Sequence, residues 1–292
     1  MDFIQALQTH AWLSITSATI LGLLVGSFLN VVIHRLPKMI NAEYKEQVDE
    51  FLKSDEYQSA STQEKINLVL PRSRCPHCGH QITALENIPV ISYLFLGGRC
   101  SGCKKSISKR YPIVELVTGI LSLVVVYYFG ATWQGAAALL FTWCMIALTL
   151  IDYDTYYLPD VITLPLVWLG LIANYYGLFT NFGSAFWGAV WGYMSLWTLN
   201  QVFKLLRGRD GMGAGDFKLF AALGAWMGWQ MLVQIALFSS LVGAVIGISL
   251  MFIKNRNKDH QIPYGPYLAI AGWIAFLFGD EINRQYLKII LP

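Results

Sequence analysis

Charged side chains are scarce in this sequence. Asp, Glu, Lys and Arg make up only 13% of its 292 residues, whereas 55% of the residues are hydrophobic. Ordinary soluble domains contain about 25% charged residues, so this composition, with a mean hydropathy of +0.47, excludes that class. We therefore expect a membrane protein, with lipid as a partner and no nucleic acid.

Apolar runs that approach the length of about 20 residues needed to cross a bilayer recur along the chain. We predict an all-α polytopic membrane protein with about eight transmembrane helices, the sixth of which is short. The predicted spans lie near residues 12–33, 113–130, 133–151, 161–178, 184–203, 217–228, 231–253 and 266–279.

No basic segment precedes the first run and no small-residue cleavage site follows it, which argues against a cleaved secretory signal. The loops near residues 131, 179 and 229 also lack Lys and Arg, whereas residues 35–110 contain twelve of the 21 basic residues. Basic loops stay on the cytoplasmic side of a membrane. We therefore predict a multi-pass protein of the bacterial inner membrane, with residues 35–110 in the cytoplasm and both termini outside.

Residues 35–112 form the one sizeable polar insertion. Its first part, NAEYKEQVDEFLKSDEYQ at 41–58, places Tyr44, Val48, Phe51 and Leu52 on one face of a helix. We interpret this segment as an amphipathic helix that packs on the rest of the insertion or on the membrane surface.

Two CxxC pairs follow in the same insertion, with 21 residues between them. Each pair places two thiolates on one tight turn, and two such turns that face each other form a tetrahedral site for Zn²⁺. Two disulfides are the alternative, but cytoplasmic thiols are kept reduced. The zinc ligands predicted on this basis are Cys75, Cys78, Cys100 and Cys103.

Three other potential ligands are interpreted without a role at the metal. His77 and His80 can each replace a sulfur, but four cysteines already complete the coordination. Cys144 lies inside the third apolar run, where a free cysteine behaves as a small hydrophobic residue.

Four carboxylates lie where apolar runs meet the predicted cytoplasmic surface: Asp152, Asp154, Asp160 and Asp216. Asp160 and Asp216 occur at the starts of predicted helices, where an acid caps the helix and complements its dipole. Asp152 adjoins a helix C-terminus, where the dipole disfavours a negative charge. A membrane-edge acid without an evident partner indicates a functional site.

Two such acids brought together across a helix bundle share one proton, because like charges a few ångströms apart do not both ionise. One then serves as general base toward water while the protonated one polarises a carbonyl, which is the chemistry of aspartic peptidases. Gly211, Gly213 and Gly215 precede Asp216 and either permit a close approach to it or are ordinary loop glycines. No strand precedes them, which argues against a phosphate-binding loop.

These motifs resemble the type IV prepilin peptidase family, the bifunctional leader peptidases and N-methyltransferases of pilus and type II secretion systems. The resemblance rests on GSFLNVVIHRLP at 26–37, the CxxC pairs, SISKRYPIVELVTG at 106–119, IDYDTYYLPDVITLP at 151–165 and GAGD at 213–216. The GxGD signature is shared with presenilin-like aspartyl proteases.

The resemblance implies that Asp152 and Asp216 are catalytic and that the four cysteines bind structural zinc; at Asp154 the family's pattern tolerates other residues. It also implies cleavage of type IV prepilins and pseudopilins at the cytoplasmic face, and methylation of the new N-terminus from S-adenosylmethionine. The corresponding domains are a first transmembrane helix (1–34), a cytoplasmic zinc-binding and methyltransferase region (35–112) and a transmembrane peptidase domain (113–292).

The residues that bind S-adenosylmethionine are left unassigned. Arg110, Glu115, Glu86 and Asn87 are near enough to the cleavage face to hold the cofactor or the amine, but each also has a structural interpretation, as an interfacial anchor, a first-turn acid or a turn residue. Two other functions stay open: a peptidase without methyltransferase activity, and a transporter coupled to protons or metal ions.

Overall fold

The computed structural model describes residues 3–52, 67–254 and 263–290, and these residues are helical or irregular, with two isolated β-bridges and no strand. The all-α prediction is confirmed at this level. The chain divides into two compact units, one formed by Ile15–Leu123 and the other by Met1–Ser14 with Val124–Pro292.

The first unit is built on two long helices, α2 (Ala11–Leu52) and α4 (Arg110–Phe129), with the short helices η1 (Leu85–Asn87) and α3 (Ile91–Phe95) between them in sequence. A further short helix, α1 (Phe3–Thr9), precedes α2 in sequence and belongs to the other unit. The helix α2 differs from the sequence analysis, which ended the first helix near residue 34. It runs unbroken into the amphipathic segment, because residues 38–52 contain good helix formers and no glycine.

Proline at position 37 does not interrupt α2, although its ring removes one backbone donor. Residues 53–58 of the predicted amphipathic segment lie outside the described residues. Tyr44, Val48 and Phe51 are all exposed on the described part of α2, so packing of this face on the insertion is not seen among the described residues.

Small residues bring α2 and α4 close together. A methyl group added at Gly26 would lie 2.7 Å from the Cα atom of Glu115, and one added at Gly22 would overlap Ser122. Asn30 donates a hydrogen bond from Nδ2 to the carbonyl oxygen of Tyr111, at 3.2 Å. Close backbone contact through small residues is typical of helices that pack in a membrane.

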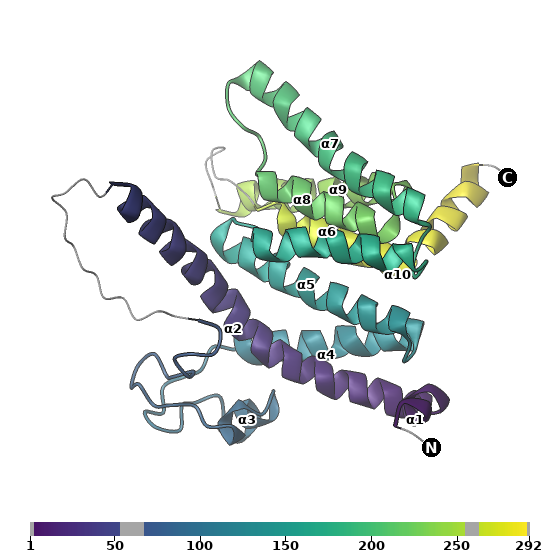
Figure 1. The fold of residues 1–292 in the computed structure, drawn as a ribbon. Coiled ribbons are helices and arrows are strands. Elements are labelled where there is room, and N and C mark those ends of the chain that lie inside the picture. The colour runs from purple at the N-terminus through teal and green to yellow at the C-terminus, as the bar shows by residue number, and fades with distance from the viewer. Residues whose placement is uncertain (1–2, 53–66, 255–262, 291–292) are drawn as a thin grey trace. The chain divides into compact units, whose positions relative to one another are not determined.

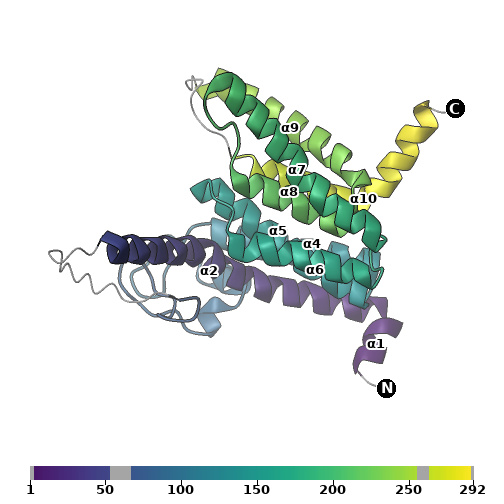
Figure 2. The same ribbon diagram turned by 45° about the horizontal axis from the view of Figure 1, so that its top comes forward.

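The second unit is a bundle of six helices in which α8 is central (Figures 1 and 2). These helices are α5 (Trp133–Thr155), α6 (Asp160–Tyr175), α7 (Phe182–Arg207), α8 (Ala214–Met227), α9 (Gln230–Lys254) and α10 (Gly265–Ile290). Helix α8 contacts α6, α7, α9 and α10, and its residues from Phe217 onward are almost all buried.

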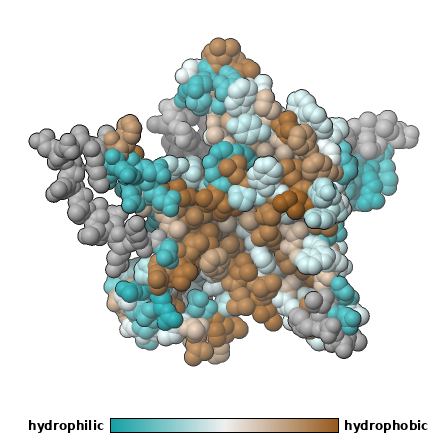
Figure 3. Space-filling view, viewed as in Figure 1, coloured by the Kyte–Doolittle hydropathy of each residue, from teal (hydrophilic) through white to brown (hydrophobic). Residues whose placement is uncertain are grey.

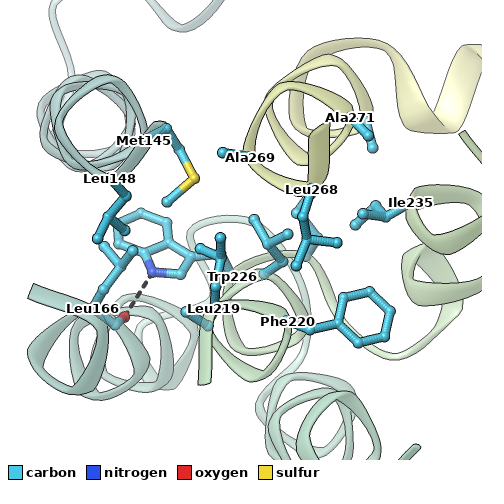
Figure 4. Packing of buried hydrophobic residues seen from close by; sticks show 14 of the residues in the cluster. Met145, Leu148, Leu166, Leu219, Phe220, Trp226, Ile235, Leu268, Ala269 and Ala271 are labelled. Carbon is cyan, nitrogen blue, oxygen red and sulfur yellow. Dashed lines mark hydrogen bonds between the residues drawn. The ribbon is translucent and has the colours of Figure 1, made fainter. Parts of the chain in front are cut away.

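Trp226 holds the end of α8 in the core of this bundle. Its ring packs against Phe141 at a centroid distance of 4.9 Å, and its indole Nε1 donates a 2.8 Å hydrogen bond to the carbonyl oxygen of Leu166 (Figure 4). Met145 and Leu148 of α5 line the same region. The buried indole therefore has its polar group satisfied, as a buried Trp requires.

Each of the eight predicted apolar runs overlaps one helix, but only four described helices are both long and apolar enough to cross a membrane: Ala11–Phe51, Arg110–Phe129, Trp133–Thr155 and Gln230–Ser249. Hydrophobic side chains cover much of the visible face of the molecule (Figure 3), which suits a lipid environment. Helix α8 has 14 residues, about 21 Å, and is surrounded by other helices rather than exposed.

Candidate active site and metal centre

Asp152 lies in the last turn of α5 and is only 5% exposed. The helix ends three residues later, where Tyr156 takes a left-handed conformation with φ of 55° and donates its backbone N–H to the Asp152 carbonyl oxygen. The side-chain oxygen Oδ2 of Asp152 is buried and, within the described residues, accepts no hydrogen bond of ordinary geometry. An unpartnered buried carboxylate oxygen is energetically unfavourable and points to a functional group.

Asp216 lies in the first turn of α8 and is 8% exposed. Gly213, not Asp216, is the N-cap residue, and the Asp216 backbone N–H donates to the Gly213 carbonyl oxygen at 3.2 Å. The N-cap interpretation of Asp216 is therefore wrong, although a first-turn acid still interacts favourably with the helix dipole.

The two buried acids belong to one site. The two residues are 64 apart in sequence, yet the helices that carry them, α5 and α8, both pack against α10. The Leu158 side chain links their surroundings, because methyl groups added at Gly215 and Gly265 would lie 2.8 Å from its Cβ and 3.2 Å from its Cδ1. The structure thus brings together the two acids that the resemblance names.

Gly265, the first residue of α10, packs directly on the Asp152 carboxylate. A methyl group at this position would lie 2.6 Å from Oδ2 and 3.1 Å from Cγ of Asp152, which is closer than real contacts allow. The sequence analysis missed this residue. Its only sequence signal is the Gly–Pro pair at 265–266, which marks a turn or helix start but not the partner across the bundle.

Asn200 on α7 holds the loop that precedes Asp216, and the sequence analysis missed it as well. Its Oδ1 accepts the backbone N–H groups of Gly211 and Met212 at 2.8 and 3.1 Å, and its Nδ2 donates to Asp210 at 3.2 Å. The Asn200 side chain is nearly buried. A polar residue at this place in an apolar helix is a signal that sequence reading can use.

The glycines of GMGAGD serve two purposes. Methyl groups at Gly211 and Gly215 would lie 2.8 Å from Phe203 Cδ1 and Leu158 Cβ, so these two positions permit close packing. Gly213 has more room, since its nearest neighbour would be Oδ2 of Asp216 at 3.8 Å. The close-approach interpretation therefore holds at Gly211 and Gly215, which pack against Phe203 and Leu158 of the same chain. At Gly213 the lack of a side chain leaves space beside Asp216.

The other two acids of the membrane edge differ in burial and partners. Asp154 is exposed, two residues beyond Asp152. Asp160 lies in the first turn of α6, as expected, and both of its oxygens accept 2.7 Å hydrogen bonds from Lys218 Nζ. Neither has the buried, unpartnered environment of Asp152.

The four cysteines of the two CxxC pairs converge, with all sulfur atoms within 4.8 Å of one another. The Sγ atoms of Cys75 and Cys103 are 3.8 Å apart, and those of Cys78 and Cys100 are 3.9 Å apart. Four sulfurs at about 2.3 Å from a tetrahedral Zn²⁺ lie about 3.8 Å from one another. These side chains therefore fit a tetrahedral metal ion, and neither pair forms a disulfide.

Each CxxC pair lies on a turn with the same backbone pattern. The N–H of Cys75 donates to His80 and that of Gly79 to Cys75, and the second turn repeats both bonds at Cys100 and Lys104. Backbone amides of His77 and Cys78 lower the pKa of the Cys75 thiol to about 6, whereas burial and the neighbouring thiols raise the pKa of Cys78 to about 11. The first turn therefore favours the thiolate form, which binds metal, at Cys75.

Glu86 and His80 form a second layer beside these turns. The Glu86 carboxylate accepts hydrogen bonds from the Ser101 side chain, the Thr83 backbone N–H and the His80 side chain. These bonds lower the pKa of the carboxyl group to about 2. His80 Nε2 lies 3.2 Å from Glu86 and 2.9 Å from the Ser101 hydroxyl. His80 is not part of the four-sulfur cluster, as the sequence analysis expected.

Glu115 also has a structural partner, because its Oε2 accepts the backbone N–H of Val90 at 2.8 Å. Of the residues considered for S-adenosylmethionine, Glu86 and Glu115 thus both bind groups of the chain itself. We assign neither of them to the cofactor.

The sequence matches two family descriptions that together cover most of the chain. Residues 20–129 match the Bacterial Peptidase A24 N-terminal domain, and residues 139–248 match the Type IV leader peptidase family. No solved structure gives a significant match.

Curated relatives match the chain over nearly its full length. A protein of Pseudomonas aeruginosa is 54% identical, over 99% of this chain and 98% of its own. A protein of Stutzerimonas stutzeri is 53% identical over 99% of both chains, and one of Neisseria gonorrhoeae is 47% identical over 91% of both. All three are named prepilin leader peptidase/N-methyltransferase. With these relatives and with its paired aspartates and four-cysteine cluster, the chain belongs to the type IV leader peptidase family.

Proposed function

We propose that this protein cleaves the leader peptides of type IV prepilins and pseudopilins and then methylates the new N-terminal residue. The observation that carries the peptidase proposal is that two buried aspartates, on α5 and α8, have neighbours, Gly265 and Gly215, that both pack on the Leu158 side chain, and that Oδ2 of Asp152 accepts no hydrogen bond within the described residues. The names of the relatives supply the substrate class and the second activity.

The proposed catalytic residues are Asp152 and Asp216, acting as a pair that holds one proton. The ionised carboxylate takes a proton from a water molecule, whose oxygen attacks the carbonyl carbon of the scissile peptide bond. The protonated carboxyl donates to the carbonyl oxygen, and the tetrahedral intermediate then collapses with proton transfer to the leaving amine. Burial of both side chains excludes other water and strengthens these interactions.

We further propose that all eight apolar helices cross the bacterial inner membrane, with the aspartates and the cysteines on the cytoplasmic side. The distribution of basic residues supports this orientation. Asp152 ends one helix and Asp216 begins another, so the acids lie at helix ends rather than near the midplane where transporters hold their coupling ions. This position favours a peptidase over a transporter.

The four cysteines are proposed to hold one structural Zn²⁺, which would fix the two turns of residues 75–80 and 100–105 against each other. We also propose three domains: a first transmembrane helix (1–34), the region 35–112 and the peptidase domain (113–292). The region 35–112 is proposed to carry the methyltransferase activity. S-adenosylmethionine would supply the methyl group. The amine that accepts it is the one freed at the cleavage site.

The test is cleavage of a reconstituted prepilin by three variants. In each variant one Asp carboxyl group is replaced by the Asn amide, which has a similar shape. Asp152→Asn and Asp216→Asn should each lower kcat by about 10²–10⁴-fold, the usual contribution of general acid–base catalysis. The exposed Asp154→Asn is the matched control and should cleave normally. Loss of activity only in Asp154→Asn would overturn the assignment of Asp152.

Methylation is tested separately on the processed substrate. Mass spectrometry with and without S-adenosylmethionine should show one added methyl group on the new N-terminus only when the cofactor is present. Complete cleavage without methylation would leave the alternative of a leader peptidase that lacks the transferase activity.

A further inference from the structure

Helix α3 presents an apolar face that no described residue of its own unit covers. Ile91, Leu94 and Phe95 are 51%, 70% and 88% exposed. Their spacing of i, i+3 and i+4 puts all three on the same side of the helix. Such a grouping of large exposed apolar residues marks a contact surface.

The start of α3 is tied to a membrane-spanning helix. The bond from the Val90 N–H to Glu115 Oε2 fixes the residue just before α3 against α4, and Glu115 is almost fully buried. Glu115 lies five residues into α4, about 8 Å along its axis from Arg110. Because α4 is one of the four described helices that can cross a membrane, α3 begins beside one end of a candidate membrane span.

The backbone at this junction is unusual, which shows that the position is enforced. Val90 has a φ of 59° and ψ of −46°, and the Ile91 N–H donates to the Pro89 carbonyl oxygen at 2.5 Å. This is a γ-turn with a positive φ, a strained conformation for a β-branched residue. The bond to Glu115 and this turn together hold a tight reversal of the chain just before α3.

Three further hydrogen bonds attach this segment and the adjoining start of α4 to α2. Arg35 on α2 donates to the carbonyl oxygens of Asn67 and Pro71 at 2.9 and 2.7 Å, and Asn30 donates to the carbonyl oxygen of Tyr111, the residue that follows the segment. Residues 67–110 are therefore held to α2 at their start and to α4 at Val90, and they continue directly into α4 at their end.

The charge of this segment suits an anionic bilayer. Residues 67–110 contain seven Lys and Arg residues and a single acid, Glu86. A Zn²⁺ ion with four thiolates would contribute −2, so the segment keeps a net charge of about +4 with the metal bound. Basic residues beside an apolar face are the composition of segments that lie in the interface of anionic membranes.

We propose that residues 67–110 rest on the anionic bilayer surface, with Ile91, Leu94 and Phe95 of α3 inserted at the headgroup level. The partner is the lipid interface itself. This contact fixes the four-cysteine turns at the plane of the membrane, in addition to the two flanking helices.

A photoreactive residue at position 95 tests this proposal in the full-length protein. Benzoylphenylalanine replaces Phe95, and the protein is placed in nanodiscs of phosphatidylethanolamine and phosphatidylglycerol. The matched control carries the same residue at Phe51, which is 91% exposed on α2 but lies about 24 Å along the helix beyond Arg35. Normal prepilin cleavage by both variants verifies that they fold.

Irradiation should yield lipid adducts at position 95 at least roughly tenfold above those at position 51, because insertion of one aromatic side chain changes partition by at least that factor. Replacing phosphatidylglycerol by phosphatidylcholine should lower the yield at position 95. Equal yields at both positions would overturn the proposal. Crosslinks from position 95 to a second copy, to prepilin or to another part of the chain in place of lipid would also overturn it.

Discussion

At the scale of single residues, the candidate site depends on one atom that is absent, the Cβ of residue 265. Asp152 is buried at the end of α5, and the start of α10 reaches its carboxylate only because Gly265 has no side chain. This contact fixes the side chain that we propose as one member of the proton-sharing pair. A larger side chain at residue 265 should therefore displace the Asp152 carboxylate, and it should affect the fold of the bundle less.

Substituting Gly265→Ala should lower kcat for prepilin cleavage by about 10²-fold, since a displacement of roughly 1 Å at a reacting group has that effect. The added methyl group would meet Oδ2 of Asp152 at 2.6 Å, so the carboxylate must move. KM should change little, because the substrate-binding surface is otherwise intact. Steady-state kinetics of the purified protein measure both quantities.

The matched control is Gly272→Ala, two turns further along α10. Its methyl group would also lie 2.6 Å from a neighbour, but that neighbour is Cδ2 of Leu223, the end of a flexible side chain. It should lower thermal stability without a selective effect on kcat. If Gly265→Ala cleaves at the normal rate while it remains folded, the Asp152 carboxylate is not held by this contact.

At the scale of helices, α8 is placed by backbone contact with α7. Gly188 and Gly224 face each other so closely that a methyl group on either would overlap the other's carbonyl group. One turn on, a methyl group at Gly192 would lie 2.6 Å from the carbonyl oxygen of Phe220. Small residues spaced by four allow such close helix crossing in membranes, and this crossing positions the helix that carries Asp216.

The variant Gly188→Ala should lower the free energy of unfolding by roughly 1–3 kcal/mol, the usual effect of inserting a methyl group into a packed interface. Backbone atoms cannot rotate away as a side chain can, so α7 and α8 must separate. Thermal unfolding in detergent, followed by circular dichroism, measures the change. Gly183→Ala on the same helix is the control, because its methyl group would have its nearest neighbour at 3.5 Å; equal effects of both would contradict the crossing.

The sequence was informative about elements whose signals are local. Apolar runs located eight helices, and the spacing of the two CxxC pairs located the four-cysteine cluster that the fold brings together. It was less informative where packing decides. Helix α2 continues to Leu52 because the residues after the apolar run favour a helix. Their polar composition led the sequence analysis to treat them as a separate segment.

Contacts between distant elements could not be predicted at all. Gly265 lies 113 residues from Asp152 in sequence, and nothing local relates a helix-start glycine to that acid. Likewise, Asn200 appears only as one polar residue in an apolar helix until the loop before Asp216 folds onto it. Residue types and spacings identify chemical groups, but only tertiary packing shows which backbone groups hold them.

At the scale of the whole molecule, the two sets of functional residues belong to different compact units. The four cysteines lie in the unit formed by Ile15–Leu123, and both aspartates lie in the unit that contains Val124–Pro292. The bundle around α8 has its own extensive core, which contains Phe141, Leu223 and Trp226. The turns that carry the cysteines have few buried apolar residues of their own, so we expect the proposed metal ion to supply much of their stability.

Removing the metal should therefore unfold residues 67–109 locally and leave the α5–α10 bundle intact. Cys75→Ser combined with Cys100→Ser removes one thiolate from each turn and should abolish a bound zinc equivalent that wild-type protein retains through purification. Hydrogen exchange should then lose protection in the two cysteine turns but not in α8. Cys144→Ser, which replaces the cysteine of α5, is the control and should keep both the metal and the protection pattern.

Enzyme assays on the same variants relate this local unfolding to the two proposed activities. If each compact unit carries one activity, the double cysteine variant should still cleave prepilin, because Asp152, Asp216 and Gly265 are all in the bundle. The same variant should methylate the cleaved product poorly. Loss of cleavage together with loss of α8 protection would mean that the bundle needs the metal-bound turns to fold. Full methylation without bound zinc would instead remove the four-cysteine cluster from the transferase activity.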